Sequence, residues 1–401
     1  MDAIHIEYLP NTRTGDEPVP EIQDMSTLQA KKIGVFHQSW PEYHPTPLRN
    51  LDALSSYLGV SAIRVKDESQ RFGIGAFKVL GSTWAIGRYL ADAWSIPLDN
   101  LTFESLHAEA KAHEPITFTA ASDGNHGLGV AWTAQQLGQR AVIYLPKGTI
   151  EERVARIRRL GAIAEVTTMN YDDTVRQVAL LSRQRGWVMV QDTSWDGYHD
   201  IPLWVMQGYL TMVREAEHQW NLTSEKPPTH IIIQAGVGSL AGSVVGWFAG
   251  RNSGQVPVIV IAEPMAAPAL YRSAAAGGQP VKISGSLDTI MAGLACGEPN
   301  PEAWKIIRSR AYGFVVCNDV VAARGTRILS NPLNGDPVIA TGESGSMPLG
   351  LLATILDQSK FVSLRAMLDL GTDARILLFN TEGVTDPDLH RELVWDGKYC
   401  V

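Results

Sequence analysis

A lysine set between apolar residues is the first candidate for chemistry in this sequence. Lys78 follows two glycines in the segment RFGIGAFKVLG (71–81) and lies between Phe77 and Val79, where a helix is expected to begin. Apolar surroundings and the positive end of a helix both disfavour the ammonium form of a lysine. Such an amine is available to form a Schiff base with an aldehyde. The alternative is a lysine that extends from a helix face with its charge in water.

A glycine-rich segment in the middle of the chain predicts a phosphate site. The segment QAGVGSLAG (234–242) follows an expected strand and precedes an expected helix, so its backbone N–H groups and the helix N-terminus suit an anion. Gly236, Gly238 and Ala241 also fit the dinucleotide fingerprint G-x-G-x-x-G/A, with Glu263 in the place of the ribose-binding acid. A tight strand-to-helix turn without any ligand is the third interpretation.

A loop of small and amide residues is the third candidate. The segment ASDGNHG (121–127) stands between an expected strand and an expected helix, where backbone N–H groups can bind a carboxylate. The side-chain amide of Asn125 can donate a hydrogen bond to a phenolate oxygen. His126 is more often, in such a position, a structural residue held by hydrogen bonds.

Strand-like and helix-like runs alternate around these candidates and must position them. Strands are expected at Ala62–Lys66, Thr117–Ala121, Ala141–Leu145, Ala162–Thr167, Trp187–Gln191, His230–Gln234, Val256–Ala262 and Arg375–Phe379. Helices are expected at Val79–Trp94, Leu128–Leu137, Ile150–Leu160 and Asp172–Arg185, with another beginning at Ser243. The Pro- and Gly-rich stretch Ser330–Gly350 is expected to be an irregular loop.

This alternation predicts an α/β fold with two parallel sheets covered by helices. Ligands of such sheets bind at the carboxyl ends of the strands. We therefore expect the site in the loops that follow Thr117–Ala121, Trp187–Gln191, His230–Gln234 and Arg375–Phe379.

Composition limits the class of protein. With 401 residues, 45% of them hydrophobic and 19% charged, the chain has the profile of a globular protein large enough for two domains. The net charge of −8 and the lack of a basic run argue against nucleic acid or an anionic membrane as the main partner. Cys296, Cys317 and Cys400 are too widely spaced for a metal cluster or a disulfide framework. We expect a cytoplasmic protein without a structural metal.

Taken together, the lysine segment, the asparagine loop and the glycine segment resemble the fold-type II enzymes that use pyridoxal phosphate (PLP), a family that includes threonine dehydratase and the tryptophan synthase β chain. The three motifs stand in the family's order and spacing. The resemblance implies two parallel-sheet α/β domains with PLP in the cleft between them. We expect residues 1–88 and 198–401 to form a large cofactor-binding domain and residues 89–197 to form a small domain. It also implies a homodimer, and it displaces the dinucleotide interpretation, which gives Lys78 and Asn125 no role.

The resemblance assigns a role to each candidate residue. PLP would be attached to Lys78, with its phosphate on Gly236, Val237, Gly238, Ser239 and Leu240, its phenolate oxygen on Asn125, its pyridine nitrogen on Thr381 and its ring against Phe77. The substrate would contact Ser122, Asp123, Gly124, His126, Asp192 and Ser344, of which Ser344 is also an alternative partner of the pyridine nitrogen. Lys78, Asp123 and Asp192 are the expected catalytic residues.

Six segments indicate which branch of the family the chain resembles. They are SDGNHG (122–127), QDTSWDGY (191–198), QAGVGSLAG (234–242), IMAGLACGEPNP (290–301), TGESGS (341–346) and NTEGVTDP (380–387). They are similar to the ammonia-lyases that convert D- or L-2,3-diaminopropionate to pyruvate and ammonia.

The carboxylates fit that branch. The dehydratases have a serine where this chain has Asp123, and a carboxylate there suits a substrate with a second ammonium group. Asp192 could supply another carboxylate, although an Asx-turn for Asp123 and a helix cap for Asp192 are structural alternatives. Two other functions stay open. They are serine or threonine dehydration by the same cofactor chemistry, and non-catalytic binding of PLP or an amino acid.

Overall fold

The computed structural model describes residues 3–12, 19–122, 124–223, 226–251 and 256–400. In this part of the chain the strands form two sheets. The larger sheet has the order β1 (Ile6–Pro10), β10 (Gly313–Cys317), β9 (Val258–Pro264), β8 (His230–Gln234), β11 (Arg375–Asn380), β3 (Ala62–Asp67) and β2 (Leu48–Asn50). The smaller sheet has the order β6 (Ile163–Val166), β5 (Arg140–Leu145), β4 (Thr117–Ala121) and β7 (Val188–Met189).

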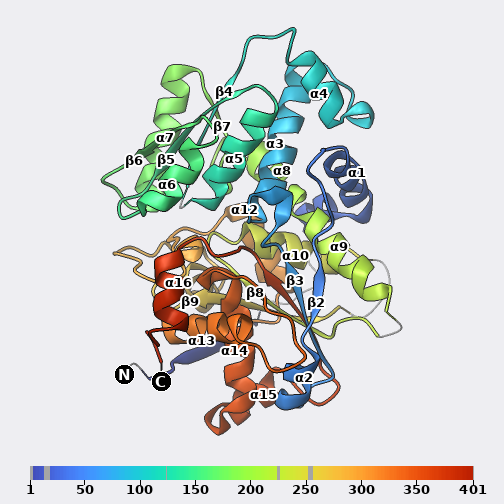
Figure 1. Ribbon diagram of the computed structural model, residues 1–401, viewed down its shortest axis with the longest axis vertical. Helices are drawn as coiled ribbons and strands as arrows, with labels where there is room; N and C mark the ends of the chain where they lie inside the picture. The colour runs from blue at the N-terminus through green and yellow to red at the C-terminus, as the bar shows by residue number, and fades with distance from the viewer. Residues whose placement is uncertain (1–2, 13–18, 123, 224–225, 252–255, 401) are drawn as a thin grey trace.

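Both sheets are parallel apart from two edge strands. The smaller sheet pairs in parallel throughout, and in the larger sheet only β1 and β2 run antiparallel to their neighbours among the described strands. The α/β class and the two parallel sheets predicted from the sequence are therefore confirmed. Figure 1 shows the smaller sheet, with α5, α6 and α7 beside it, at one end of the molecule, and the larger sheet at the other end together with both termini.

Helices alternate with these strands along most of the chain. Those before β8 are α1 (Thr27–Gln38), α2 (Asp52–Leu58), α3 (Lys78–Ala93), α4 (Phe103–Glu109), α5 (Asn125–Gln136), α6 (Glu151–Arg158), α7 (Tyr171–Arg185), α8 (Asp200–Gly208) and α9 (Leu210–Asn221). Those after β8 are α10 (Ser239–Ala249), α11 (Ala269–Ala275), α12 (Pro301–Arg310), α13 (Asp319–Ser330), α14 (Glu343–Asp357), α15 (Val362–Met367) and α16 (Pro387–Val394). None of the described helices is long and apolar enough to cross a membrane.

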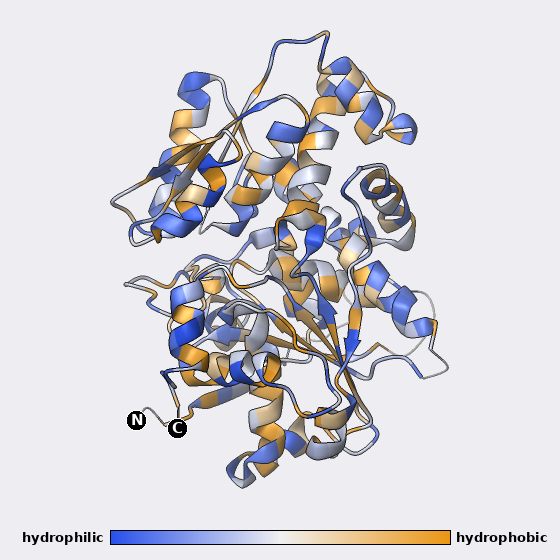
Figure 2. Cartoon of the chain, in the orientation of Figure 1, coloured by the Kyte–Doolittle hydropathy of each residue, from blue (hydrophilic) through white to orange (hydrophobic). Residues whose placement is uncertain are grey.

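The central strand β8 of the larger sheet is apolar on both faces because helices cover both. In β8, Ile231 and Ile233 join the core beneath α10 and α12, whereas Ile232 joins the core beneath α13 and α14. Successive side chains of a strand point to opposite faces, and a parallel sheet buried on both sides needs such continuous apolar runs. Figure 2 shows hydrophobic residues in orange in the strands at the centre of this sheet.

Two elements differ from the sequence-based expectation. The helix expected to begin at Ser243 begins four residues earlier, at Ser239. Gly242 is therefore not a loop residue but lies inside α10, where it allows close packing against α12. A Cβ at Gly242 would lie 2.9 Å from the Cβ of Ala303. The second half of the expected irregular loop is helix α14, in spite of Pro348. Its Gly350 allows close approach to α13, since a Cβ there would lie 2.0 Å from the backbone oxygen of Val321.

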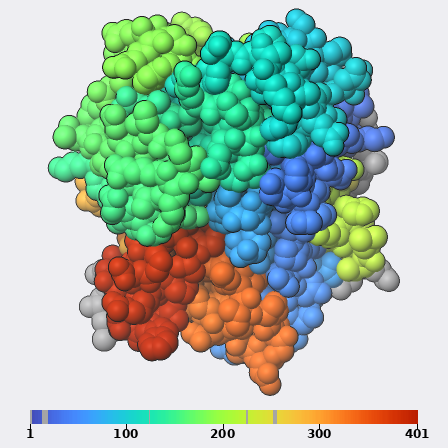
Figure 3. Space-filling view, turned by 45° about the horizontal axis from the view of Figure 1, so that its top comes forward, coloured from blue at the N-terminus to red at the C-terminus, as the bar shows by residue number. Residues whose placement is uncertain are grey.

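The expected domain boundaries stay a prediction. The four strands of the smaller sheet lie between residues 117 and 189, but α3 runs continuously across the expected boundary at residue 88. Hydrogen bonds also join the two parts directly. Arg153 of α6 donates to the hydroxyl oxygen of Thr385 at 3.3 Å, and Arg156 donates to the backbone oxygen of Ile74 at 2.7 Å. Figure 3 shows the C-terminal residues in red next to the green residues of the smaller part.

Candidate active site

A cavity lies where the carboxyl ends of strands from both sheets meet. It encloses about 650 Å³ with its open mouth included. The loops after β3, β4, β7, β8 and β11 each contribute to its lining, as the parallel topology predicted. The lining residues are Phe77, Lys78, Asn125, Tyr171, Asp192, Tyr209, Gln234, Ala235, Gly236, Val237, Gly238, Ser239, Leu240, Gly293, Leu294, Cys296, Ser344, Thr381 and Glu382.

Lys78 is the first residue of α3 and forms an ion pair with Asp192. The lysine side chain is 16% exposed and the aspartate side chain 2%, so the pair lies at the wall of the cavity. The segment before Lys78 is fixed to the loop after β11, because the backbone N–H of Phe77 donates to the backbone oxygen of Thr381 at 3.0 Å. The surroundings of the lysine amine are therefore less apolar than the flanking residues suggested, since a carboxylate lies against it.

Asp192 is held as a carboxylate. Burial alone would raise its pKa, but the ammonium group of Lys78 and the hydrogen bonds from Lys78 and from the Tyr171 hydroxyl, at 3.0 Å, lower the pKa below its ordinary value. The backbone oxygen of Asp192 accepts a hydrogen bond from the Ser239 hydroxyl. This contact joins the loop after β7 to the first residue of α10.

The glycine segment forms a cradle at the N-terminus of α10. Gly238 has φ +100°, a conformation that favours glycine, and the helix begins at the next residue. A Cβ at Gly236 would lie 3.2 Å from the Sγ of Cys296, the backbone oxygen of Gly293 and the Cα of Leu294. The N–H groups of the first helical turn have no partners within the helix, so the donor set fits a phosphate group.

Asn125 and Glu382 meet across the cavity wall. Asn125 is the first residue of α5, and its side-chain amide donates to the Glu382 carboxylate. Glu382 is 4% exposed and was not among the expected residues. Its charge adds to burial in raising the pKa of the neighbouring Glu343 to about 8. The signal that could have found Glu382 was its position directly after Thr381.

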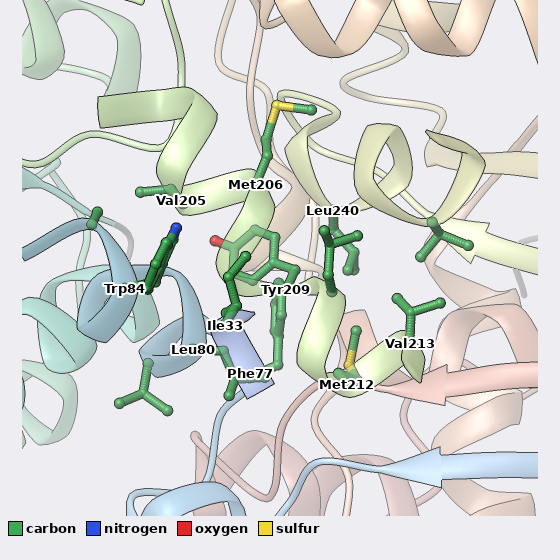
Figure 4. Packing of buried hydrophobic residues seen from close by; sticks show 14 of the residues in the cluster. Ile33, Phe77, Leu80, Trp84, Val205, Met206, Tyr209, Met212, Val213 and Leu240 are labelled. Carbon is green, nitrogen blue, oxygen red and sulfur yellow. The ribbon is translucent and has the colours of Figure 1, made fainter. Parts of the chain in front are cut away.

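Phe77 lines the cavity and packs against Tyr209. The two ring centroids are 4.7 Å apart with planes tilted by 49°. Figure 4 shows both rings among the buried side chains of α8, α9 and α3, close to Leu240. Tyr209 and Tyr171 were not expected in the site, because aromatic residues inside helices are ordinary core residues in a sequence.

The loop after β4 divides into lining and supporting residues. The oxygen of the Ser122 hydroxyl accepts the N–H of Gly124 at 2.9 Å and that of Gly127 at 2.7 Å. Nε2 of His126, a side chain only 1% exposed, is 2.7 Å from the backbone oxygen of Val190. Ser122, Gly124 and His126 are not among the described residues that line the cavity, and their contact with substrate stays a prediction. Asp123 lies outside the described residues.

The dinucleotide interpretation is wrong. Glu263, its ribose-binding acid, is fully buried and accepts the backbone N–H groups of Leu270 and Tyr271 at 2.8 and 2.7 Å. Both carboxylate oxygens therefore accept hydrogen bonds from the first turn of α11.

Comparison with known proteins agrees with this geometry. Residues 40–352 match the family described as pyridoxal-phosphate dependent enzyme. The chain is 49% identical over 376 residues to diaminopropionate ammonia-lyase of Escherichia coli (strain K12), covering 94% of each chain. The solved structure of the Escherichia coli enzyme with an aminoacrylate–PLP azomethine reaction intermediate superposes with a TM-score of 0.92 and 46% identity, covering 99% of this chain and 98% of that one.

A human L-serine dehydratase/L-threonine deaminase is 29% identical over 244 residues, covering 59% of this chain and 62% of that protein. The chain therefore belongs to the pyridoxal-phosphate dependent enzyme family, in which it groups with the diaminopropionate ammonia-lyases.

Proposed function

We propose that this protein is a PLP-dependent ammonia-lyase that converts 2,3-diaminopropionate, as the D or the L isomer, to pyruvate. Addition of one water to the substrate gives one pyruvate and two ammonia molecules. The observation that carries the proposal is the Lys78–Asp192 pair beside the glycine cradle, in a chain that resembles diaminopropionate ammonia-lyases along almost its whole length.

The residues of the cavity fit PLP. Lys78 would hold it covalently, the N–H groups of Gly236–Leu240 would bind its phosphate, and Asn125 its phenolate oxygen. Phe77 would pack on the ring, and Thr381 would meet the pyridine nitrogen. When bound, PLP withdraws electrons from the bonds of the substrate α-carbon.

The side chains of the protein supply binding and proton transfer. Lys78 is proposed as the base and acid at the reacting carbon, and Tyr171 keeps Asp192 in place through its hydroxyl. A buried carboxylate beside the amine suits a substrate with a second ammonium group, through a charge-assisted hydrogen bond. Serine and threonine lack that group, so this carboxylate favours the lyase over a dehydratase. Asp123 is proposed as the base on the other face of the substrate.

Replacing Lys78 tests this function. The unsubstituted protein should release pyruvate from DL-2,3-diaminopropionate, and borohydride reduction should fix the cofactor on the peptide that contains Lys78. Lys78→Ala should show no cofactor on that peptide by mass spectrometry and should lose at least about a thousandfold in rate, the scale of a lost acid–base residue.

Lys32→Ala is the matched control, because Lys32 is half-exposed and pairs with Asp99 at the surface. It should keep both the attached cofactor and the rate. Cofactor found on another lysine, or full activity in Lys78→Ala, would contradict the assignment.

The quaternary state and location are part of the same proposal. The resemblance supports a homodimer, and the cysteine usage supports a cytoplasmic location: Cys296, Cys317 and Cys400 are all free in the described structure. Light scattering of the purified protein tests the first, with twice the mass of the chain as the expected result.

A further inference from the structure

Gln234 is a buried residue of the cavity whose amide has a fixed orientation. It is the last residue of β8, is 1% exposed and lines the cavity beside Thr381. Its Nε2 donates to the backbone oxygen of Phe379 at 2.9 Å and to the Thr381 hydroxyl oxygen at 3.2 Å. Because a backbone carbonyl only accepts, the NH₂ side of the amide must face β11.

This orientation leaves the other side of the amide without a partner. Oε1 of Gln234 is buried and has no hydrogen-bond partner in the described structure. Buried polar atoms without partners are uncommon and need an explanation. The unpartnered oxygen of Gln234 is explained if the site requires the NH₂ group of this residue to face Thr381.

The consequence for Thr381 is a defined hydrogen-bond polarity. A hydroxyl group donates one hydrogen bond and accepts up to two. The Thr381 oxygen accepts from Gln234, so its hydrogen points elsewhere. Thr381 is 5% exposed and lines the cavity, and its hydroxyl donates no hydrogen bond within the described ranges of the chain. The hydrogen is therefore available to a group inside the cavity.

We propose that Gln234 is a positioning residue that makes Thr381 a hydrogen-bond donor toward the pyridine nitrogen of PLP, and so selects the nitrogen without a proton. This inference rests on the proposed function, which puts PLP in this cavity. A donor matches the lone pair of an unprotonated nitrogen. If position 234 carried an acceptor, the Thr381 hydroxyl would donate its hydrogen to that acceptor. The Thr381 oxygen could then only accept a hydrogen bond from PLP, which requires a protonated pyridine nitrogen.

The test is equilibrium binding to the cofactor-free protein of PLP and of its carbocyclic analogue, in which a C–H group replaces the pyridine nitrogen. The ratio of the two dissociation constants isolates the hydrogen bond to nitrogen. One hydrogen bond should make the analogue bind about fivefold to tenfold more weakly than PLP. Thr381→Val, which removes the hydroxyl, should bring the ratio close to one.

The variants at position 234 decide the role of Gln234. Gln234→Glu keeps the shape of the side chain but replaces the NH₂ donor by an acceptor, and Gln234→Met removes the donor without introducing a charge. Both should lower the ratio toward one, and Gln234→Met should change it no further in a Thr381→Val background. A ratio that stays at the unsubstituted value in both single variants would overturn the proposal, even if both bind PLP less tightly.

A control separates this effect from general loss of stability. Gln139 is also a buried glutamine: its Nε2 donates to the backbone oxygen of Leu137 and its Oε1 accepts from Ile116, both at 2.8 Å, at the far end of β5 from the cavity. Gln139→Met should keep the ratio. Pyruvate release by the unsubstituted protein is measured in parallel, so absent activity refutes the proposed function, whereas an unchanged ratio in an active protein refutes only the role of Gln234.

Discussion

Two lysines show why burial alone does not identify a reactive residue. Lys66 is fully buried, more so than Lys78, yet it lies outside the cavity in a network with Glu215 and Arg71. Its Nζ lies 2.7 Å from Glu215 Oε2 and 2.5 Å from the backbone oxygen of Thr46. Lys78 instead pairs with the Asp192 carboxylate at the wall of the cavity. The difference is that Lys66 is enclosed by its partners, whereas Lys78 borders a space that a ligand can enter.

The buried network has a direct consequence for stability. Burial alone would raise the pKa of Glu215, but the charges and hydrogen bonds of Arg71 and Lys66 outweigh it and lower the pKa to about 2. A carboxylate whose pKa is lowered on folding stabilises the folded protein at pH values above its ordinary pKa of 4.5. This stabilisation is lost as the pH falls from 4.5 toward 2.

Glu215→Gln should therefore lower the free energy of unfolding at pH 7 by about 3 kcal/mol, because it leaves two buried cations with too little negative charge. The measurement is urea unfolding at pH 7. Asp99→Asn, which breaks the exposed pair of Asp99 with Lys32, is the control and should change the free energy by less than about 1 kcal/mol. Equal small effects of the two substitutions would show that the network contributes no more than a surface pair.

At the scale of elements, the site is built from the turns at the carboxyl ends of the strands. The turns after β8, β11, β4 and β7 bring Gly238, Thr381, Asn125 and Asp192 to one cavity, although up to about 260 residues separate them in the sequence. The first turn of α10 presents backbone N–H groups, and its position depends on the positive φ of Gly238.

Gly238→Ala should weaken PLP binding at least about tenfold, since the loop must shift and lose a hydrogen bond to a charged phosphate. It should also cost about 1–2 kcal/mol of stability, because alanine is strained at φ +100°. Titration with PLP and thermal unfolding measure the two effects.

Gly186→Ala is the matched control for Gly238→Ala. Gly186 also has positive φ, +66°, at the end of α7, with no atom within 4 Å of an added Cβ. The Gly186→Ala variant should lose a similar amount of stability and keep its affinity for PLP. A loss of affinity in both variants would mean that strain, and not the phosphate cradle, causes the effect at Gly238.

At the scale of the whole molecule, the smaller sheet and its helices dock on a segment before α12. Asp172 of α7 accepts the backbone N–H of Gly297 at 3.2 Å, and Arg176 forms an ion pair with Glu298 at 2.6 Å. Burial, together with the charge of Glu298, raises the pKa of Asp172 to about 6. Ionisation of Asp172 therefore weakens this docking. The free energy of unfolding is not reduced by this ionisation below pH 3.8, the ordinary pKa of Asp172, and is reduced by the full amount above about pH 6.

Asp172→Asn should raise the stability by about 1 kcal/mol at pH 8 and change it little at pH 4, since the amide keeps an acceptor for Gly297 without the charge. Thermal unfolding at the two pH values measures this. Asp173→Asn is the control: Asp173 is the exposed neighbour that pairs with Arg176, and its replacement should not stabilise the protein at pH 8. A gain that is equal at pH 4 and pH 8 would contradict a titration of Asp172.

The sequence by itself determined the α/β class, most strands and helices, and the family. Periodicity and turn residues are local properties: the two apolar faces of β8, the helix end at Gly186 and the glycine segment at 236–238 are all written in neighbouring residues. The motif order around Lys78, Asn125 and Gly238 then indicated the cofactor.

The tertiary structure decided what depends on distant neighbours. That Lys78 meets Asp192, that Asn125 meets Glu382 and that Gln234 orients Thr381 are contacts between side chains 114, 257 and 147 residues apart. Local sequence cannot encode which loop ends face one another. The same holds for α14, where packing of Gly350 against α13 outweighed the helix-breaking tendency of glycine and proline.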